Sequence, residues 1–374
     1  MTKSLALNVG DPVLIVGGGL AGLSAARLLH GSGIDFQLRE ARQRLGGRIL
    51  TTDAMGEAST DGFDLGPSWF WPGTQASMAT LVEHLGLVTF PQSSDGDVIF
   101  QRLSWEAPQR YRGIRQESES MRLVGGTGAL VQAIASTLPP ECLRLDSALT
   151  HLALTDDGVE ARFVGSNGTE ESERARHVIL ALPPRLLAAT VSFSPALDAA
   201  TAARWHATPT WMAPHAKLFA LYERPFWRDA GLSGTAQSMV GPLVEIHDAT
   251  TASGEAALFG FVGMPAAERK TVGRDAIITA AVRQLVTLFG PDAGAPRATL
   301  FKDWAADALT ATDEDWAEGA HPLAGDRAWV EGEWRNRISL AGSETSPTEP
   351  GYLAGAVHAA ERAAVEVKQR IGTG

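Results

Sequence analysis

The sequence predicts an α/β protein with a Rossmann-like parallel sheet that is discontinuous along the chain, together with a second domain. Three observations favour this class. A strand, a glycine-rich turn and a helix follow one another near the N-terminus, and short apolar strands return at 176–182 and 337–341. Such short apolar runs are typical of parallel strands that are buried on both faces. The length of 374 residues leaves room for more than one domain.

The N-terminal segment has the pattern of a βαβ unit. The run "VLIVG" (13–17) is apolar and β-branched, as a buried strand requires. Residues 20–33 have helical character and end on glycine, and "DFQLRE" (35–40) supplies a second short strand. The turn between the first strand and the helix is therefore the expected ligand-binding point of the unit.

Three glycines in this turn, Gly17, Gly19 and Gly22, form the pattern G-x-G-x-x-G. In a dinucleotide-binding unit the first permits a tight turn, the second lets a pyrophosphate approach the backbone, and the third lets the helix pack closely on the sheet. The helix N-terminus offers its amide groups to the anion. Glu40 ends the second strand, where an acid accepts hydrogen bonds from ribose hydroxyls. These four residues predict a dinucleotide site.

The composition argues against several other classes. The formal net charge of −11 argues against nucleic-acid binding, which needs a basic face. Cys142 is the sole cysteine, so neither an internal disulfide nor a cysteine-based zinc cluster is expected, and the histidines show no metal-ligand spacing. The first residues lack a signal-peptide pattern, and no run reaches the roughly 18 apolar residues of a membrane helix. The sequence predicts a soluble, cytoplasmic protein without a metal.

The segment after Glu40 reads "EARQRLGGRILT" (40–51). It resembles the E-A-R-x-R-x-G-G-R motif of the flavin amine oxidase superfamily, which includes monoamine, polyamine and L-amino acid oxidases. The resemblance implies FAD, with Arg42 and Arg48 toward its pyrophosphate and flavin side and Gly47 close to the cofactor. A second glycine pair beside arginines is also what a second anion-binding turn requires.

The resemblance continues in order over nearly the whole chain. The segment "DGFDLGPSWFW" (61–71) resembles the family's segment beside the flavin ring, and 143–163 resembles a pair of strands that approaches the adenine through backbone near Ala148. The segment 337–367 resembles the C-terminal motif A-G-x-E-T…G-Y-x-x-G-A-V, in which Gly342 and Glu344 belong to the FAD site. The family's cysteine that links the flavin is absent, so FAD is expected to be non-covalent.

The same resemblance predicts the domain boundaries. The FAD-binding domain is expected to comprise 1–85, 121–205 and 320–374. The residues 86–120 and 206–319 are expected to form a smaller α+β substrate-binding domain with a mixed or antiparallel sheet.

Five residues are candidates for the reaction itself. Lys217, in "APHAKLFALY", resembles the lysine that holds a water at flavin N5, and a lysine in so apolar a strand needs a partner. Tyr352 resembles one wall of an aromatic cage that favours an amine through its π faces. Trp304 resembles the tryptophan that leans on the flavin, and Trp69 an aromatic that lines the substrate cavity. Trp316 is the candidate for the second wall, because the family's second tyrosine is absent.

The main departure from the family is a missing helical insertion that usually covers the substrate cavity. Only about fifty residues separate Trp71 from Gly125. This predicts an open flavin site that admits a small or bulky amine, or a site closed by a second subunit or a partner protein. A lid formed by 232–255, which is rich in glycine, serine and threonine, is a further possibility.

The predicted function is oxidation of an amine C–N bond to an imine, with O2 as electron acceptor and release of H2O2. Two alternatives stay open. A desaturase or porphyrinogen-oxidase-like enzyme would act on an apolar substrate and need neither Lys217 nor an amine-directed cage. A non-catalytic FAD-binding protein is favoured by the loss of the insertion and of the second cage tyrosine.

Overall fold

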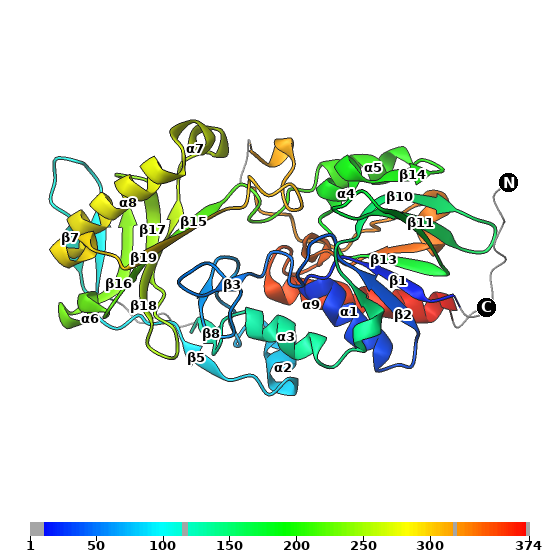
Figure 1. The fold of residues 1–374 in the computed structure, drawn as a ribbon, viewed down its shortest axis with the longest axis horizontal. Coiled ribbons are helices and arrows are strands. Elements are labelled where there is room, and N and C mark those ends of the chain that lie inside the picture. The colour runs from blue at the N-terminus through cyan, green and yellow to red at the C-terminus, as the bar shows by residue number, and fades with distance from the viewer. Residues whose placement is uncertain (1–10, 114–118, 317–319, 372–374) are drawn as a thin grey trace. The chain divides into compact units, whose positions relative to one another are not determined.

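The computed structural model describes residues 11–113, 119–316 and 320–371. The chain divides into two compact units (Figure 1). Unit 1 comprises Met1–Arg48, Val131–Trp211 and Ala320–Gly374, and unit 2 comprises Ile49–Leu130 and Met212–Gly319. Residues 49–85 and 121–130, which the sequence assigned to the FAD-binding domain, thus fall within unit 2.

Unit 1 is built on a five-stranded parallel sheet with the order β20-β13-β1-β2-β9. Its strands are β1 (Val13–Val16), β2 (Phe36–Arg39), β9 (Leu143–Arg144), β13 (His177–Leu180) and β20 (Ile338–Leu340). Helices α1 (Leu20–His30) and α9 (Leu353–Ile371) pack against each other beside this sheet, as Figure 1 shows. Strands β1, β13 and β20 are buried on both faces, which explains their largely apolar sequences. The α/β class with a Rossmann-like parallel sheet is confirmed.

A second, four-stranded sheet completes unit 1, with the order β12-β11-β10-β14. It contains β10 (Ala148–Leu154), β11 (Val159–Val164), β12 (Glu170–Ala175) and β14 (Ser192–Ser194). Strands β10 and β11 pair antiparallel through a short turn, which confirms the pair of strands expected within 143–163. The remaining helical segments of this unit are α4 (Pro184–Thr190), α5 (Ala199–His206), η1 (Pro140–Cys142), η4 (Gly332–Asn336) and η5 (Ser343–Thr345).

Unit 2 is built on a seven-stranded mixed sheet with the order β19-β15-β18-β17-β16-β6-β7. Its strands are β6 (Asp97–Gln101), β7 (Gln109–Tyr111), β15 (Ala216–Tyr222), β16 (Leu232–Ser238), β17 (Leu243–Asp248), β18 (Ala256–Val262) and β19 (Ala298–Asp303). Strands β16 and β6 run parallel, whereas the other neighbours in the sheet run antiparallel.

The two faces of this sheet have different surroundings. On one face Leu218, Leu258 and Ile246 pack against α8 (Arg274–Phe289) in a large apolar core. On the other face Phe219 and Phe259 form a smaller cluster with residues of the 49–70 segment. Successive residues of each strand therefore point alternately into the core beside α8 and into the smaller cluster on the other face.

Shorter elements surround the sheet of unit 2. Strand β3 (Thr51–Thr52) pairs with β4 (Phe63–Asp64), and β5 (Thr89–Pro91) pairs with β8 (Met121–Leu123). Helices α2 (Ala76–His84), α6 (Phe226–Asp229) and α7 (Ala266–Val272) and the turns η2 (Pro291–Gly294) and η3 (Asp313–Trp316) complete the unit, and α3 (Gly128–Ala135) contains residues of both units. In the described ranges, no helix has the length and apolar character needed to cross a membrane.

The predicted lid at 232–255 is wrong. This segment supplies β16 and β17, which pair antiparallel within the seven-stranded sheet. Ala236 and Ile246 are fully buried, because both belong to the core on the α8 side. Burial of this alternate set of apolar residues outweighs the loop-like composition of the segment.

Candidate active site

The glycine turn after β1 requires glycine at two of its predicted positions. Gly17 has φ +105°, and a Cβ there would lie 2.7 Å from the carbonyl oxygen of Ala181. A Cβ on Gly22 would lie 1.8 Å from the carbonyl oxygen of Gly17. Helix α1 therefore packs directly on the turn that precedes it.

Gly19 differs from these two glycines because the chain itself does not require it. Its φ of −76° is open to any residue. The nearest atom to a Cβ at this position would be the carbonyl oxygen of Gly46, at 3.8 Å, which is an ordinary contact. Gly19 is also the N-cap residue of α1 and makes no side-chain cap hydrogen bond. The open space beside free helix amides fits a pyrophosphate.

Glu40 and its neighbours connect the two glycine turns. The buried carboxylate of Glu40 accepts hydrogen bonds from the amides of Gly18 at 2.6 Å and Arg42 at 2.8 Å. The Arg42 guanidinium lies 3.7 Å from the same carboxylate. Arg44, to which the sequence analysis gave no role, donates to the carbonyl of Gly47 at 2.8 Å. Arg44 is the second arginine of the E-A-R-x-R motif, and this position is the sequence signal that could have identified it.

Arg48 and Glu344 form an ion pair, with 2.5 Å between Nη1 and Oε1. Arg48 also donates to the Ser343 hydroxyl at 3.0 Å and to the Trp211 carbonyl at 2.8 Å. The Glu344 carboxylate is fully buried, and the Trp211 amide also donates to it. Glu344 therefore fixes the position of Arg48, so three distant segments of unit 1 meet at this pair.

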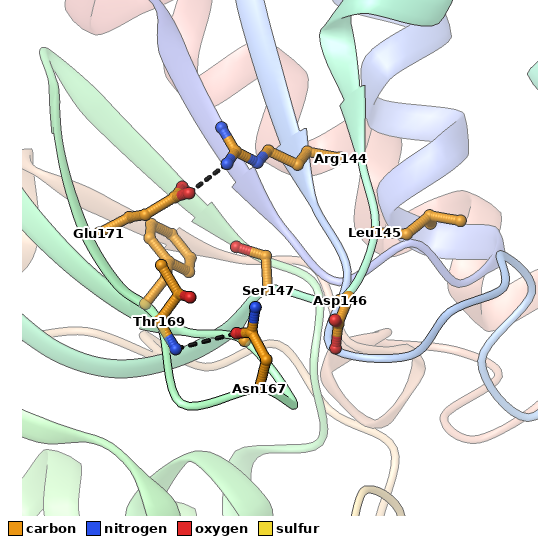
Figure 2. Close-up of a pocket in the computed structure, with 9 residues that line it drawn as sticks. Arg144, Leu145, Asp146, Ser147, Asn167, Thr169 and Glu171 are labelled. Carbon is orange, nitrogen blue, oxygen red and sulfur yellow. Dashed lines mark hydrogen bonds and ion pairs between the residues drawn. The ribbon is translucent and has the colours of Figure 1, made fainter.

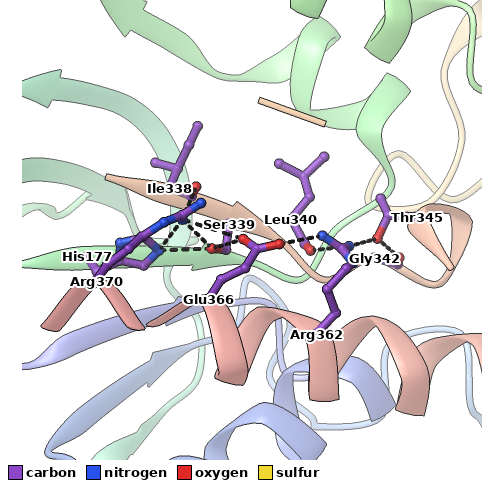
Figure 3. A network of polar contacts seen from close by, with 9 residues as sticks. All are labelled: His177, Ile338, Ser339, Leu340, Gly342, Thr345, Arg362, Glu366 and Arg370. Atoms are coloured by element: carbon purple, nitrogen blue, oxygen red, sulfur yellow. Dashed lines mark hydrogen bonds and ion pairs between the residues drawn. The ribbon is translucent and has the colours of Figure 1, made fainter. Parts of the chain in front are cut away.

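Helix α9 fixes the turn that carries Gly342 and Glu344 (Figure 3). Arg362 donates to the carbonyl of Leu340 and to the hydroxyl of Thr345, each at 2.8 Å, and Thr345 in turn donates to the carbonyl of Gly342 at 2.8 Å. A Cβ on Gly342 would lie 2.3 Å from the carbonyl oxygen of Leu182. The turn thus lies tightly between the end of β13 and α9.

Tyr352 lies in an aromatic group that the sequence did not predict. Its ring is 38% exposed and lies 5.1 Å from the ring of His321, which lies 4.3 Å from the ring of Trp211. Gly351 has φ +85° and leaves space for the Trp211 side chain. The sequence analysis assigned no role to His321, because its position beside Tyr352 depends on the fold of the whole unit.

Lys217 is buried in unit 2, with 1% of its surface exposed. Its ammonium donates to the carbonyls of Asp64 and Gly66 and to the Ser68 hydroxyl. Burial lowers the pKa of Lys217 to about 7, against the opposing attraction of Asp64. Burial also raises the pKa of Asp64, although hydrogen bonds from threonines stabilise its charged form. The partner that a buried lysine needs is therefore the 64–68 segment.

Trp69 and Trp304 lie around the same segment. The Trp304 indole is buried and donates to the Leu65 carbonyl at 3.0 Å, and Lys302 lies over its ring. The Lys217 ammonium lies 4.7 Å from the ring centre of Phe259 and 6.0 Å from that of Trp69. Unit 2 thus brings three of the predicted residues, Lys217, Trp304 and Trp69, to one place.

Trp316, the candidate for the second cage wall, packs within unit 2. Its indole donates to the Ala305 carbonyl at 3.1 Å, and the Lys270 ammonium lies 5.2 Å from its ring centre. These contacts give it a local packing role, and its part in a cage stays a prediction.

A polar pocket of about 220 Å³ lies between residues 144–147, which directly precede Ala148 in the sequence, and residues 163–171 (Figure 2). Arg144 and Glu171 pair across it, and the Thr169 amide donates to Asn167. It is lined by Arg144, Leu145, Asp146, Ser147, Phe163, Gly165, Asn167, Thr169 and Glu171. None of these is a predicted FAD contact, so the pocket is a feature of the surface next to the predicted adenine position.

Comparison with known proteins agrees with this geometry. The chain is 27% identical to the putative flavin-containing monoamine oxidase AofH of Mycobacterium tuberculosis, over 95% of this chain and 96% of the relative. It is 22% identical to the probable flavin-containing monoamine oxidase A of Dictyostelium discoideum, over 96% and 98% of the two chains.

Solved structures share the fold. A putrescine oxidase variant superposes with a TM-score of 0.78 at 19% identity, covering 96% of this chain and 99% of the other. Cyclohexylamine oxidase from Brevibacterium oxydans gives 0.78 at 21% identity, covering 97% and 100%.

The family model for flavin-containing amine oxidoreductases matches residues 20–117 and 101–368, which is most of the chain. The cofactor of this protein is FAD, held non-covalently. This agrees with the space beside Gly19 and with the single cysteine, Cys142. The chain belongs to the flavin-containing amine oxidoreductase family and is an FAD-dependent, amine oxidase-like oxidoreductase.

Proposed function

We propose that the protein oxidises a primary amine to the imine with O2 as acceptor. In the overall reaction R–CH2–NH2 and O2 give R–CH=NH and H2O2, and water then converts the imine to an aldehyde and ammonia. FAD, when bound, supplies the two-electron acceptor between amine and O2. The names of two structural neighbours, putrescine oxidase and cyclohexylamine oxidase, support amines as the substrate class.

The observation that carries this proposal is Lys217. A lysine that is 1% exposed and held by three acceptors is costly unless its charge has a use. We assign it a role at flavin N5, where a cation stabilises the negative charge that develops on oxygen. The desaturase-like alternative gives this buried cation no role.

The other predicted residues have supporting roles in this proposal. We assign Gly17, Gly19 and Gly22 with Glu40 to the dinucleotide, and the Arg48–Glu344 ion pair to the flavin side of the cofactor. Trp69 forms apolar surface beside Lys217, and Trp304 packs on the same 64–68 segment through Leu65; we assign both to the exclusion of water from Lys217. Tyr352 shapes the approach of the amine.

The test separates the two half-reactions. Oxidised holoenzyme is mixed anaerobically with primary amines and with apolar substrates that lack an amine, and flavin bleaching is followed at its visible absorbance. Amines are expected to bleach it, and O2 is then expected to restore the colour with one H2O2 per amine.

Tyr352 supplies the variant for this test. Tyr352→Ala is expected to slow bleaching by amines while FAD stays bound, and Tyr352→Phe is expected to have little effect, because the ring rather than the hydroxyl shapes the approach. If no amine bleaches the flavin, amine oxidation is excluded. If air does not reoxidise the reduced flavin, the acceptor is not O2.

A further inference from the structure

The ammonium of Lys217 is held by a segment that lies outside the seven-stranded sheet. Its acceptors are the carbonyls of Asp64 and Gly66 and the hydroxyl of Ser68. Asp64 belongs to β4, which pairs with β3 in a separate two-stranded sheet. The position of the ammonium therefore depends on how the 64–68 segment is fixed in unit 2.

The side chain of Asp64 fixes this segment. Its Oδ1 accepts hydrogen bonds from the Thr51 hydroxyl at 2.6 Å and from the Thr127 amide at 2.8 Å, and the Thr127 hydroxyl lies 2.9 Å away. The chain closes tightly around the same oxygen, since Gly126 has φ +72° and a Cβ there would lie 2.7 Å from it. Asp64 thus anchors the residues that hold Lys217.

The surroundings of Asp64 suit a carboxylate better than a neutral acid. The donors at Oδ1 stabilise negative charge. A neutral acid would carry its proton on Oδ2, and this buried atom has no hydrogen-bond partner in the part of the chain that the structure describes. Burial raises the pKa of Asp64, and the hydrogen bonds of Thr51 and Thr127 and the charge of Arg122 oppose that shift.

Arg122 is a second buried cation that Asp64 attracts. It donates to the carbonyls of Thr250 and Ala249, at 2.8 and 3.3 Å. Burial lowers the pKa of Arg122, and the charge of Asp64 raises it. The two charges act on Lys217 in opposite directions, because Asp64 favours its ammonium and Arg122 disfavours it. Lys217 therefore keeps its proton against the repulsion of Arg122 only while Asp64 is charged.

Among the described residues, the other titratable groups around Lys217 do not replace Asp64. Lys302 lies opposite Lys217 on β19 and pairs with Asp307 at 3.0 Å. Burial and nearby cations lower the pKa of His215 below its ordinary 6.5, so this ring is neutral while Lys217 titrates. On β18 aromatic rings face the ammonium. Asp64 is thus the negative charge available to Lys217.

We propose that Asp64 is a positioning residue for Lys217, whose carboxylate keeps the lysine protonated and holds it in place. The consequence for the reaction with O2 rests on the proposed function, whereas the effect on the charge of Lys217 does not. An opposite charge nearby shifts a pKa by about 1 to 3 units. Removal of the Asp64 charge is therefore expected to lower the pH midpoint of Lys217, at which it is half protonated, by about one unit or more.

The protonation of Lys217 can be followed directly, because the chain has five lysines. Oxidised holoenzyme is labelled with lysine that carries carbon-13 at Cε, and the Cε signals are recorded by NMR between about pH 5 and pH 9. The signal that is lost in Lys217→Met belongs to Lys217. The midpoint is expected near pH 7 in the wild type and near pH 6 or below in Asp64→Asn.

Reoxidation of the reduced enzyme by O2 supplies the second measurement. The Asn amide keeps the shape of Asp64 and an oxygen for Thr51 and Thr127, so the change is mainly one of charge. A midpoint one unit lower leaves the rate at about pH 5 nearly unchanged and slows it about fivefold at pH 7. A purely structural role would instead lower the rate by a similar factor at every pH.

Two variants test whether the effect is specific. Asp248→Asn removes another buried carboxylate of unit 2, which pairs with Arg228, and is expected to leave the midpoint of Lys217 unchanged. Arg122→Met removes the repelling cation and is expected to raise the midpoint, so it tests the proposal even if Asp64→Asn does not fold. A circular dichroism spectrum and FAD content equal to wild type show that a variant is folded.

The two measurements separate this inference from the proposed function. If the midpoint of Lys217 stays at its wild-type pH in folded Asp64→Asn, or does not rise in folded Arg122→Met, Asp64 is not the counter-charge and the inference is wrong. If the midpoint falls in Asp64→Asn while reoxidation keeps its wild-type pH profile, the counter-charge stands and the role of Lys217 in the reaction with O2 is wrong.

Discussion

Lys217 shows how a single residue can combine burial with a protonation state that changes near neutral pH. Its ordinary pKa of 10.5 is lowered to about 7, because burial disfavours the charged form. The ammonium is therefore present below about pH 7 and is lost as the pH rises through that value. The three acceptors around it suit the charged form, which has three protons to donate.

This gives a prediction for reoxidation of the reduced flavin. The rate of the reaction with O2 is expected to fall as the pH rises through about 7 in the wild-type enzyme, because the cation disappears. Lys217→Met is expected to be about 100-fold slower at pH 6 and independent of pH. Stopped-flow mixing of reduced enzyme with O2 measures both. A variant with unchanged reoxidation would show that Lys217 does not act on this step.

At the level of single residues the glycines of the first turn follow from a local pattern, whereas the role of Lys217 was expected from a family resemblance and stays a prediction. The sequence did not predict that Glu245 and His247 form a hydrogen-bonded pair. Their common face is decided by register with β18, and Phe259 and Trp69 come from distant parts of the chain. His321 was missed for the same reason, since Tyr352 lies beside it in space only.

At the level of elements, α9 determines the geometry of the turn between β20 and itself. Arg362 donates hydrogen bonds to the end of β20 and to Thr345, and these bonds hold the helix, the strand and the Gly342 turn together. The ion pair of Arg362 with Glu366 orients the guanidinium for these bonds. We therefore expect FAD binding to depend on Arg362, although the hydrogen bonds of this side chain are made to the protein itself.

Arg362→Met is expected to weaken FAD binding by about 10-fold, because it removes two hydrogen bonds that fix the turn. Arg362→Lys is expected to recover part of the affinity, since a lysine reaches one acceptor at a time. Titration of apoprotein with FAD measures the affinity, and thermal unfolding of the apoprotein measures stability separately. Glu361→Gln, at the adjacent exposed position, is the control. An unchanged FAD affinity in Arg362→Met would contradict the prediction.

The sequence predicted elements well where the pattern is local. The βαβ unit and the β10–β11 hairpin formed as expected, because their apolar periodicity and turns lie within a few residues. Strands β16 and β17 were instead read as a lid. Their glycines, serines and threonines are typical of loops, and pairing with β18 and β6 decides their structure.

At the scale of the whole molecule, a buried histidine links stability to pH. Burial and the nearby Arg370 lower the pKa of His177 to about 3, and Arg337 acts in the same direction. His177 pairs with Ser339, which also accepts from Arg370 and donates to Glu366 (Figure 3). The folded protein therefore keeps His177 neutral at a pH where the unfolded chain protonates it.

The unfolded state binds more protons than the folded state between pH 6.5 and about 3, so this residue makes stability fall as the pH decreases below 6.5. Between pH 6.5 and 4.5 the loss is expected to be about 2 kcal/mol. His177→Gln keeps a polar partner for Ser339 and is expected to lose about that much less over the same interval. Urea unfolding at a series of pH values measures it. Parallel curves for the two proteins would show that His177 does not control the acid dependence.

The order of segments in unit 1 has a consequence for synthesis. Strand β13 pairs with β1 on one side and with β20, from the last segment of unit 1, on the other. The segments of unit 2 all precede Ala320, whereas unit 1 still lacks β20 and α9 when they have been made. A nascent chain released before β20 is made would therefore carry every strand of the seven-stranded sheet, together with a parallel sheet in which one edge of β13 is unpaired. An unpaired strand edge promotes aggregation, so we expect a chain without β20 and α9 to aggregate more readily than the whole chain.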